Sequence, residues 1–510
     1  MKPEPRLRLW YRKVMTFDLE DSTLFGNEAA EDEDAAVFDA YFLRRSDYSS
    51  FGSNEHKFLV ARAYKGEGKS AILREAESTI AKSHPASLRI VTTAANIAVA
   101  PDTQSPDDWV RAWKHSILER VAQEVGTRIG FALGDDAIGL VEEAERAGFR
   151  ARNLVSTILD RAKPKLKDFS LDLRKLGIPS PSRVLQRFPR DYPIWLFIDD
   201  VDLNYDNSDS SKAKIASLMT ACRQLVNLLP ELHIRTSIRP NIWVIIKREA
   251  EAMSHVEQYM VDLTWQTVDL RNLLAERLKG YLKRTNQGLG HFQNKSRQQN
   301  EEQLIAELFE PKMPWGGVAD GEQQTRPPHV VLGTLSRQRP RWLIELCKEA
   351  AKFASRRESL TITYKDITRC LESFGERRVS DTIVEFRSMC PEIEEILTAF
   401  AKQAEDYKTD ELITLIEKRI LTHVNVKISG SVGNASAINI AQFLFQIGFI
   451  TARRQENGGY QHYSYVDKPE LLKSRTSVDQ GLAWEIHPVF RQVLQIRDPS
   501  GTKYRRSSRR

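Results

Sequence analysis

The sequence predicts an α/β protein built on a wound parallel sheet. Three observations lead to this class. Short apolar runs alternate with helical segments through the first half of the chain, a glycine loop separates one such run from a helix, and another apolar run ends in acids. Alternating strands and helices are typical of a parallel sheet whose strands are joined by helices.

Composition and charge limit the classes of protein that fit. The chain has 510 residues, of which 41% are hydrophobic and 28% charged, so we expect a folded protein of two to four domains. The net charge of +6 is modest, and any surface for nucleic acid must be local. The four cysteines form no CxxC pair, which argues against a zinc site and favours a reducing cytoplasm. No apolar stretch approaches the roughly 20 residues of a membrane span.

The first domain is expected after a lead-in segment, residues 1–50. Residues 51–260 read as a core in which KFLVARA is a strand, the glycine loop follows and SAILREAESTIAKS is a helix. A helical insertion is expected at about 105–190, before the central strand YPIWLFIDDVD. A helix at 211–230 and a strand at 233–247 complete the alternation.

Two further domains are predicted from the change of pattern. Residues 261–380 carry amphipathic segments in succession and are interpreted as a helical lid. Residues 381–497 have three helical segments followed by two strand-like arms around Gly458 and Gly459, which indicates a winged-helix-like domain. Residues 498–510 read as a basic disordered tail.

The glycine loop has the features of a phosphate-binding loop. AYKGEGKS fits the pattern GxxxxGK[ST] except for alanine at its first position, and the nucleotide is expected to contact Ala63, Tyr64, Lys65, Gly66, Glu67, Gly68, Lys69 and Ser70. The glycines let successive N–H groups turn inward, Lys69 reaches the β and γ phosphates, and the Ser70 hydroxyl binds Mg²⁺. The alternative is an ordinary glycine turn between a strand and a helix.

Acidic residues follow the central strand. Asp199 ends IWLFID and is the expected carboxylate ligand of Mg²⁺, while Asp200 or Asp202 is the candidate base that activates water. The alternative is that these acids merely end the strand.

Two arginines are candidate sensors of the γ-phosphate. Arg239 ends the strand segment HIRTSIR, and Arg341 stands at the head of a lid helix, where its neighbours Arg337 and Arg339 are alternatives. Both positions also suit solvated surface arginines.

The motifs AYKGEGKS and FIDDVD, with SRQRPRWLIELCKEA and WEIHPVFRQVL, resemble those of bacterial P-loop ATPases related to the STAND, KAP and origin-recognition AAA-type ATPases. The resemblance runs from about Phe25 to Leu494. It implies a P-loop NTPase fold of the ASCE/AAA-like kind, with a helical lid, a C-terminal winged helix, and work beside DNA-processing or antiphage defence genes. Ala63 and Asp200 depart from the usual glycine and glutamate, which favours slow hydrolysis or a switch held with ATP.

Contact with duplex DNA is an open expectation. The hairpin TARRQENGGYQHYSY carries Arg453, Arg454 and His462, but the helix expected to read a groove, NASAINIAQFLFQIGF, has no basic residue. A protein-binding wing is the alternative, and the tail would add salt-sensitive attraction.

The leading hypothesis is a cytoplasmic ATPase that uses ATP and Mg²⁺ to switch assembly or partner engagement, as a homo-oligomer or with an effector protein. The competing hypotheses are an ATP-bound scaffold that hardly hydrolyses, and a DNA-binding regulator with a vestigial loop.

Overall fold

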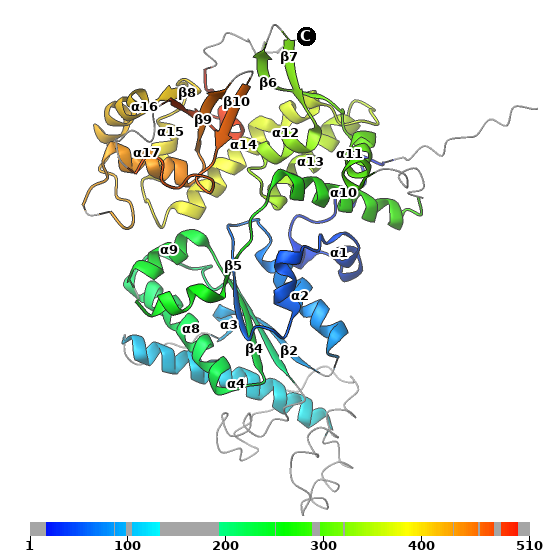
Figure 1. Cartoon of the computed structure of the whole chain (residues 1–510), viewed down its shortest axis with the longest axis vertical. Coiled ribbons are helices and arrows are strands. Elements are labelled where there is room, and N and C mark those ends of the chain that lie inside the picture. Colours follow the sequence, from blue (N-terminus) through cyan, green and yellow to red (C-terminus); the bar gives the residue numbers. More distant parts are fainter. Residues whose placement is uncertain are drawn as a thin grey trace, which may run out of the picture.

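The computed structural model describes residues 17–85, 87–97, 105–132, 193–249, 251–287, 296–319, 322–431, 433–456, 459–473 and 481–497. Most of the expected helical insertion, Gly458 of the expected turn and the basic tail lie outside these ranges. The described elements form two bodies, one above the other in Figure 1. The lower body is built on a parallel sheet, and the upper body contains the lid and the C-terminal domain.

The lower body contains a five-stranded sheet in the order β2-β3-β4-β1-β5, in which every paired strand is parallel. The strands are β1 (Phe58–Arg62), β2 (Leu88–Thr93), β3 (Ile194–Asp199), β4 (Leu232–Ile238) and β5 (Met260–Asp262). Strand β4 therefore lies between β1, which leads into the glycine loop, and β3, which ends in Asp199. This is the ASCE-type arrangement of a P-loop NTPase.

Helices cover both faces of this sheet, which explains why its central strands are almost wholly apolar. Helix α2 (Lys69–Ser83) packs on one face, where Ile72, Leu73 and Ile80 meet the buried side chains of β1 and β3. The other face is covered by α4 (Pro106–Ala132), α8 (Asp209–Leu228) and α9 (Pro240–Glu249). The short helices α3 (Ala94–Ile97), η4 (Glu251–His255) and η5 (Glu257–Tyr259) complete the body.

One strand expected from the sequence is wrong in its second half. Residues 233–247 were expected to be extended, but β4 ends at Ile238 and α9 begins at Pro240. Proline at the first helical position favours a helix start, and Ile242, Trp243 and Ile246 then face the core at helical spacing.

The first described residues join the two bodies. This stretch contains η1 (Ala30–Asp32), α1 (Ala35–Tyr41) and η2 (Ser46–Gly52). Arg74 of α2 donates to the carbonyls of Ala30 and Glu33, while Arg277 of the lid donates to the carbonyls of Phe25 at 2.6 Å and Asn27 at 2.9 Å. The segment Phe25–Glu33, hereafter the strap, is thus held from both sides.

The lid is helical, as expected, with one addition. Its helices are α10 (Thr267–Arg284), α11 (Arg297–Leu308), α12 (Pro328–Leu335), α13 (Pro340–Ser355) and α14 (Tyr364–Phe386). Between α11 and α12 the chain forms an antiparallel hairpin of β6 (Met313–Ala319) and β7 (Glu322–Arg326), which the sequence analysis did not predict. Helix α14 continues past residue 380 toward the C-terminal elements.

The C-terminal elements form a winged-helix-like domain around a four-stranded antiparallel sheet in the order β10-β9-β11-β8. Its helices are α15 (Ile393–Thr398), α16 (Thr409–Ile416) with the π-helical turn η7 (Glu417–Leu421), α17 (Ala437–Gln446) and α18 (Pro488–Arg491). Its strands are β8 (Asp406–Lys408), β9 (Ile450–Glu456), β10 (Gly459–Tyr463) and β11 (Leu482–Ile486). Strands β9 and β10 form the wing.

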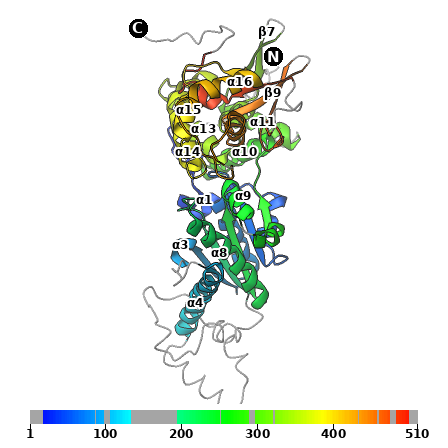
Figure 2. The ribbon, with the colours of Figure 1, turned by 90° about the vertical axis from the view of Figure 1, so that its left-hand side faces the viewer.

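The clusters of buried hydrophobic side chains show which parts of the chain pack into one unit. One continuous cluster of buried side chains includes both the lid helices and the winged-helix-like domain, whereas the parallel sheet has two clusters of its own. Figure 2 shows the same division from the side, with α13 to α16 above and α4 and α8 below. The lid and the C-terminal domain therefore form one packed unit, hereafter the upper body.

Candidate nucleotide-binding site

The glycine loop lies where the sequence places it, between β1 and α2. Gly66 and Gly68 have φ angles of +84° and +102°, a region that side chains other than glycine rarely adopt. The hydrogen bonds among described residues use none of the backbone N–H groups of Gly66, Gly68, Lys69 and Ser70. The loop therefore presents a row of free donors at the N-terminus of a 15-residue helix, which is an anion-binding arrangement.

Lys69 lies within the loop. Its Nζ donates to the carbonyl oxygens of Ala63 at 3.1 Å and Tyr64 at 3.4 Å. The first position of the motif thus contributes a carbonyl rather than a side chain, and Ala63 itself is buried. A phosphate group held by the loop's N–H donors fits beside this ammonium.

Glu67 stabilises the shape of the loop. Its carboxylate accepts a hydrogen bond from the Tyr64 N–H at 2.6 Å, and its carbonyl accepts one from Trp265 Nε1 at 2.8 Å. Burial raises the pKa of the Glu67 carboxyl, and the charge of Arg339 opposes that rise. The side chain of Glu67 thus closes the turn internally.

The carboxylate expected to bind Mg²⁺ lies at the end of β3, two strands from the loop. Asp199 Oδ1 accepts a hydrogen bond from Ser237 Oγ at 2.6 Å, and Ser237 is buried at the end of β4. The sequence analysis missed Ser237. Its signal was the polar residue near the end of HIRTSI, because parallel register brings the ends of neighbouring strands together.

Asp200 and Asp202, the two candidate bases, differ in environment. Asp200 is exposed and has a φ angle of +54°, which aspartate tolerates better than most residues. Desolvation, followed by the charges of Asp199 and Asp202, raises its pKa, while the charge of Lys69 opposes the rise. Asp200 therefore lies within the electrostatic reach of the loop lysine.

Asp202 is buried and bonded to Arg239. Its Oδ2 accepts from the Arg239 N–H at 2.6 Å, its Oδ1 lies 3.2 Å from Arg239 Nε, and its carbonyl accepts from Arg239 Nη2 at 3.2 Å. Two residues predicted to act on the nucleotide are thus each other's partners.

Arg341 lies directly over the loop. Its N–H donates to the Gly66 carbonyl at 3.1 Å, and a Cβ on Gly66 would lie 3.1 Å from the Arg341 Cβ. Within the described ranges its guanidinium has no ion pair or hydrogen bond. Arg341 is thus a cation of the upper body that remains available at the glycine loop.

The neighbouring arginines have other partners. Arg337 donates to the Ile447 carbonyl at the end of α17, and Arg339 forms a buried ion pair with Glu385 at 2.7 Å. They join parts of the molecule and leave Arg341 as the candidate sensor.

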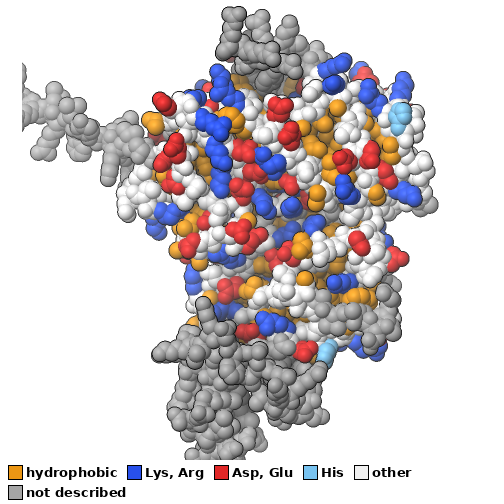
Figure 3. All heavy atoms as spheres, turned by 180° about the vertical axis from the view of Figure 1, so that it is seen from behind, with side chains coloured by type: hydrophobic (Ala, Val, Ile, Leu, Met, Phe, Trp, Pro, Cys, Tyr) orange, Lys and Arg blue, Asp and Glu red, His pale blue; other side chains and the backbone are white. Residues whose placement is uncertain are grey.

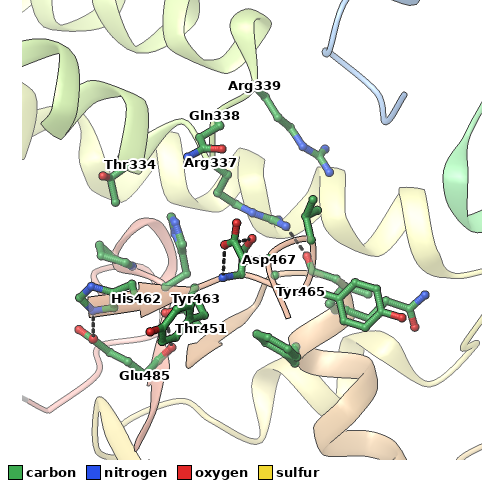
Figure 4. Close-up of a pocket in the computed structure, with 18 of the residues that line it drawn as sticks. Thr334, Arg337, Gln338, Arg339, Thr451, His462, Tyr463, Tyr465, Asp467 and Glu485 are labelled. Atoms are coloured by element: carbon green, nitrogen blue, oxygen red, sulfur yellow. Dashed lines mark hydrogen bonds and ion pairs between the residues drawn. The ribbon is translucent and has the colours of Figure 1, made fainter. Parts of the chain in front are cut away.

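Apart from the glycine-loop site, a cavity of about 2250 Å³ lies between the lid and the wing, on the side of the loop formed by Tyr64 and Glu67. Figure 4 shows Thr334, Arg337, Gln338 and Arg339 from the lid on one side and His462, Tyr463 and Glu485 from the winged-helix-like domain on the other. Lys69, Ser70 and Asp199 do not line it. This cavity and the candidate phosphate site are therefore distinct.

The wing residues expected to meet DNA are partly occupied. Arg453 pairs with Asp406, and His462 Nε2 lies 2.7 Å from Glu485 Oε2, a contact drawn in Figure 4. Arg454 has no ion pair to a described residue and lies over the ring of Tyr463. On the face in Figure 3, basic and acidic side chains of the described residues are interspersed.

No described residue of α17 is fully exposed, and its Phe443 packs against Phe386 of α14 with ring centroids 6.3 Å apart. Phe443 of this helix thus contacts the lid, while its Asn439, Gln442 and Gln446 line the cavity between the lid and the wing.

No described helix has the length and hydropathy needed to cross a lipid bilayer.

No protein-family model and no curated protein sequence matches the chain. Among solved structures, it is similar to the Aeropyrum pernix ORC2 protein in its ADPNP–ADP complexes, with 12% identity, a TM-score of 0.39, and 91% of this chain and 98% of that chain covered. It is also similar to Cdc6p from Pyrobaculum aerophilum (10% identity, TM-score 0.32, coverage 91% and 98%) and to Drosophila ORC bound to DNA (10%, 0.30, coverage 97% and 97%).

Proposed function

We propose that this chain is an ATPase that binds ATP with Mg²⁺ and acts as a nucleotide-dependent switch. The observation that carries the proposal is the row of free N–H donors of Gly66, Gly68, Lys69 and Ser70 at the start of α2, with the Lys69 ammonium beside it. A helix N-terminus with such donors favours a phosphate group.

The residues suit this ligand in separate ways. The loop donors and Lys69 would hold the phosphates, and the Ser70 hydroxyl with the Asp199 carboxylate would hold Mg²⁺, which neutralises phosphate charge when bound. Ser237 orients Asp199 through the 2.6 Å hydrogen bond. Arg341, whose backbone N–H donates to the Gly66 carbonyl, would bring a positive charge from the upper body to the phosphates.

Asp200 is the proposed base that takes a proton from the attacking water. It is exposed, whereas Asp202 is buried against Arg239. A raised pKa brings a carboxylate closer to the range useful for proton transfer. Asp202 and Arg239 shape the turn that carries Asp200.

The partners are proposed from the sequence motifs and the wing. Duplex DNA would meet the wing at Arg454, and assembly would involve further copies of the chain or an effector protein in the cytoplasm. The pathway, DNA-linked work or antiphage defence, follows from the resemblance alone. The alternatives are a scaffold that retains ATP and a DNA-binding regulator with a vestigial loop.

The test compares ATP binding and hydrolysis by the wild type, Lys69→Ala and Lys82→Ala, with and without duplex DNA. Lys82 is a matched control because it lies in the last turn of the same helix and pairs with Asp39 at the surface. Circular dichroism and thermal melting establish that all three proteins are folded.

We expect Lys69→Ala to abolish Mg²⁺-dependent ATP binding and turnover, and Lys82→Ala to retain both. Stimulation by DNA supports a DNA-coupled switch, and tight binding without turnover in every condition supports the scaffold. Absence of ATP binding by the folded wild type would overturn the proposal.

A further inference from the structure

The outer backbone of the glycine loop is held by two buried residues of the upper body. Glu385, near the end of α14, accepts a hydrogen bond from the Lys65 N–H at 3.2 Å through Oε1. Arg339, just before α13, donates through Nη1 to the Lys65 carbonyl at 3.3 Å. The same Nη1 lies 2.7 Å from Glu385 Oε2. One ion pair therefore binds both the backbone N–H and the backbone carbonyl of Lys65.

This ion pair is shielded from water. The side chains of Arg339 and Glu385 are 4% and 1% exposed, and the guanidinium stacks over the rings of Tyr64 and Trp342. Burial alone would raise the pKa of Glu385, but the charge and hydrogen bond of Arg339 and the Lys65 N–H outweigh it, and the pKa lies below the usual value. A charge-assisted hydrogen bond in such a setting is stronger than one in water.

These contacts lie at the junction of the two bodies. The glycine loop belongs to the lower body, while Arg339 and Glu385 belong to the packed unit that includes the winged-helix-like domain. Phe386, the next residue, contacts Tyr64 of the loop and Phe443 of α17, with ring centroids 6.0 Å and 6.3 Å apart. The same end of α14 therefore touches both the loop and the helix of the winged-helix-like domain.

The contacts leave the anion-binding donors free. Glu385 and Arg339 bind the N–H and carbonyl of Lys65, whereas the free donors begin at Gly66. The pair can thus fix the loop backbone without occupying the positions that face a phosphate.

We propose that Arg339 and Glu385 are positioning residues that preorganise the glycine loop for phosphate and make its affinity depend on docking of the upper body. The inference rests on the proposed nucleotide function and adds the way in which that site is regulated. Because coupling between two sites is reciprocal, a partner that displaces the upper body weakens nucleotide binding, and nucleotide opposes that displacement.

The test uses Glu385→Gln in the full-length chain, which preserves shape and a hydrogen-bond acceptor but removes the charge. The control is Glu301→Gln, since Glu301 is also buried and paired with an arginine, Arg271 at 3.2 Å, but lies in the lid away from the loop. Arg339→Lys is the second variant, because it keeps a positive charge and loses the forked donors.

Three measurements are made on each protein. Amide hydrogen exchange of the peptide covering residues 64–70, without nucleotide, reports the loop itself. Equilibrium binding of a fluorescent ATP analogue with Mg²⁺ reports affinity, and steady-state hydrolysis separates KM from kcat.

We expect Glu385→Gln and Arg339→Lys to speed exchange in the 64–70 peptide and to raise the Kd about tenfold, with a smaller change in kcat. Glu301→Gln should leave both the local exchange and the Kd near wild type. If Glu385→Gln does not fold, Arg339→Lys decides the question by the same measurements.

Unchanged loop exchange and unchanged Kd in folded Glu385→Gln or Arg339→Lys would overturn the inference while leaving the ATPase proposal intact. Equal effects of Glu301→Gln would also overturn it, because they would indicate general loosening of the lid. Failure of the wild type to bind the analogue refutes the nucleotide function. The hydrogen exchange of the 64–70 peptide, measured without nucleotide, still tests whether the Arg339–Glu385 pair holds the loop.

Discussion

The Asp202 carboxylate and the Arg239 guanidinium form an ion pair with an Oδ1–Nε distance of 3.2 Å, and Asp202 is only 3% exposed. The pair joins the loop after β3 to the start of α9. The two acids thus have different environments: Asp202 is held by this ion pair, whereas Asp200, two residues earlier, is exposed. The two acids should therefore respond differently to substitution.

Asp202→Asn should lower the free energy of unfolding by about 2 kcal/mol, because it leaves Arg239 without its charged partner. Asp200→Asn should change it by less than about 0.5 kcal/mol, since asparagine also tolerates a positive φ, and should reduce turnover about 100-fold or more. Urea titration and hydrolysis assays measure the two effects. Similar destabilisation by both substitutions would contradict this division of roles.

Ser237→Ala should raise the Mg²⁺ concentration needed for half-maximal ATP binding or turnover about tenfold, because Asp199 loses the hydroxyl that orients it. Thr236→Val is the matched control. The Thr236 hydroxyl, on the neighbouring residue, donates to the Ile198 carbonyl at 2.8 Å and does not touch Asp199. If Thr236→Val raised the half-maximal Mg²⁺ concentration as much as Ser237→Ala, the orienting role of Ser237 would be contradicted.

Gly26→Ala should destabilise the protein by about 2 kcal/mol or more, because the strap has no room for a methyl group. Gly26 has a φ of +67°, and an added Cβ would lie 2.5 Å from Arg277 Nη1 and 2.7 Å from Tyr41 Cε1. Gly433→Ala, at a φ of +74° with open space around it, should cost only about 1 kcal/mol. Chemical unfolding of both variants distinguishes steric crowding at Gly26 from the backbone strain that both positions share. Equal losses of unfolding free energy would mean that the strap is not packed as described.

The winged-helix-like domain should lose stability in two steps as the pH falls. Burial, followed by the charge of Arg337, holds the pKa of His487 well below its usual value, so the unfolded chain binds a proton first and stability falls below about pH 6.5. Burial alone would raise the pKa of Glu485, but His462, Arg491 and Arg453 lower it to about 2. Its stabilising contribution is complete above the unfolded pKa of about 4.3 and is lost as the pH falls toward 2.

His487→Asn should flatten the first step, whose slope is at most about 1.4 kcal/mol per pH unit, and leave the second unchanged. Asparagine can still cap α18, where His487 now accepts from the Val489 N–H. Denaturation midpoints between pH 2 and 8 measure both steps. An unaltered slope between pH 5 and 6.5 in the variant would show that another group titrates there.

If duplex DNA binds at the wing, Arg454→Ala should weaken binding and reduce the salt dependence by about one counterion. Arg453→Ala should act chiefly on stability, because Arg453 is paired with Asp406 within the domain. Binding titrations at several salt concentrations distinguish the two. Greater loss of affinity in Arg453→Ala at equal stability would reverse the assignment.

The lower body could be predicted where neighbouring residues determine the structure. The strand, glycine loop and helix from Phe58 to Ser83, and the strand ending at Asp199, follow from apolar runs and turn chemistry within short stretches. The division into domains at residues 50, 260 and 380 stays a prediction.

Features that depend on distant contacts could not be read in this way. Glu385 meets Lys65 across 320 positions of sequence, and nothing near Glu385 in the sequence marks it. Arg235, in the middle of β4, looks like a break in a buried strand. It is tolerated because it donates to the carbonyls of Phe51, Ser53 and His56 and stacks on Trp195.

The strap has a geometric consequence for movement between the two bodies. The chain passes from the lower to the upper body at Leu263–Gln266, and the strap, held by Arg74 below and Arg277 above, is a second attachment. Once the contacts of Arg339, Glu385 and Arg341 with the glycine loop are broken, these two attachments would leave one rotational degree of freedom, about the line through them. While the strap is bound, the upper body should rotate about this line as a hinged domain rather than detach. Release of Arg277 from the strap would remove the second attachment and, with it, the fixed hinge axis.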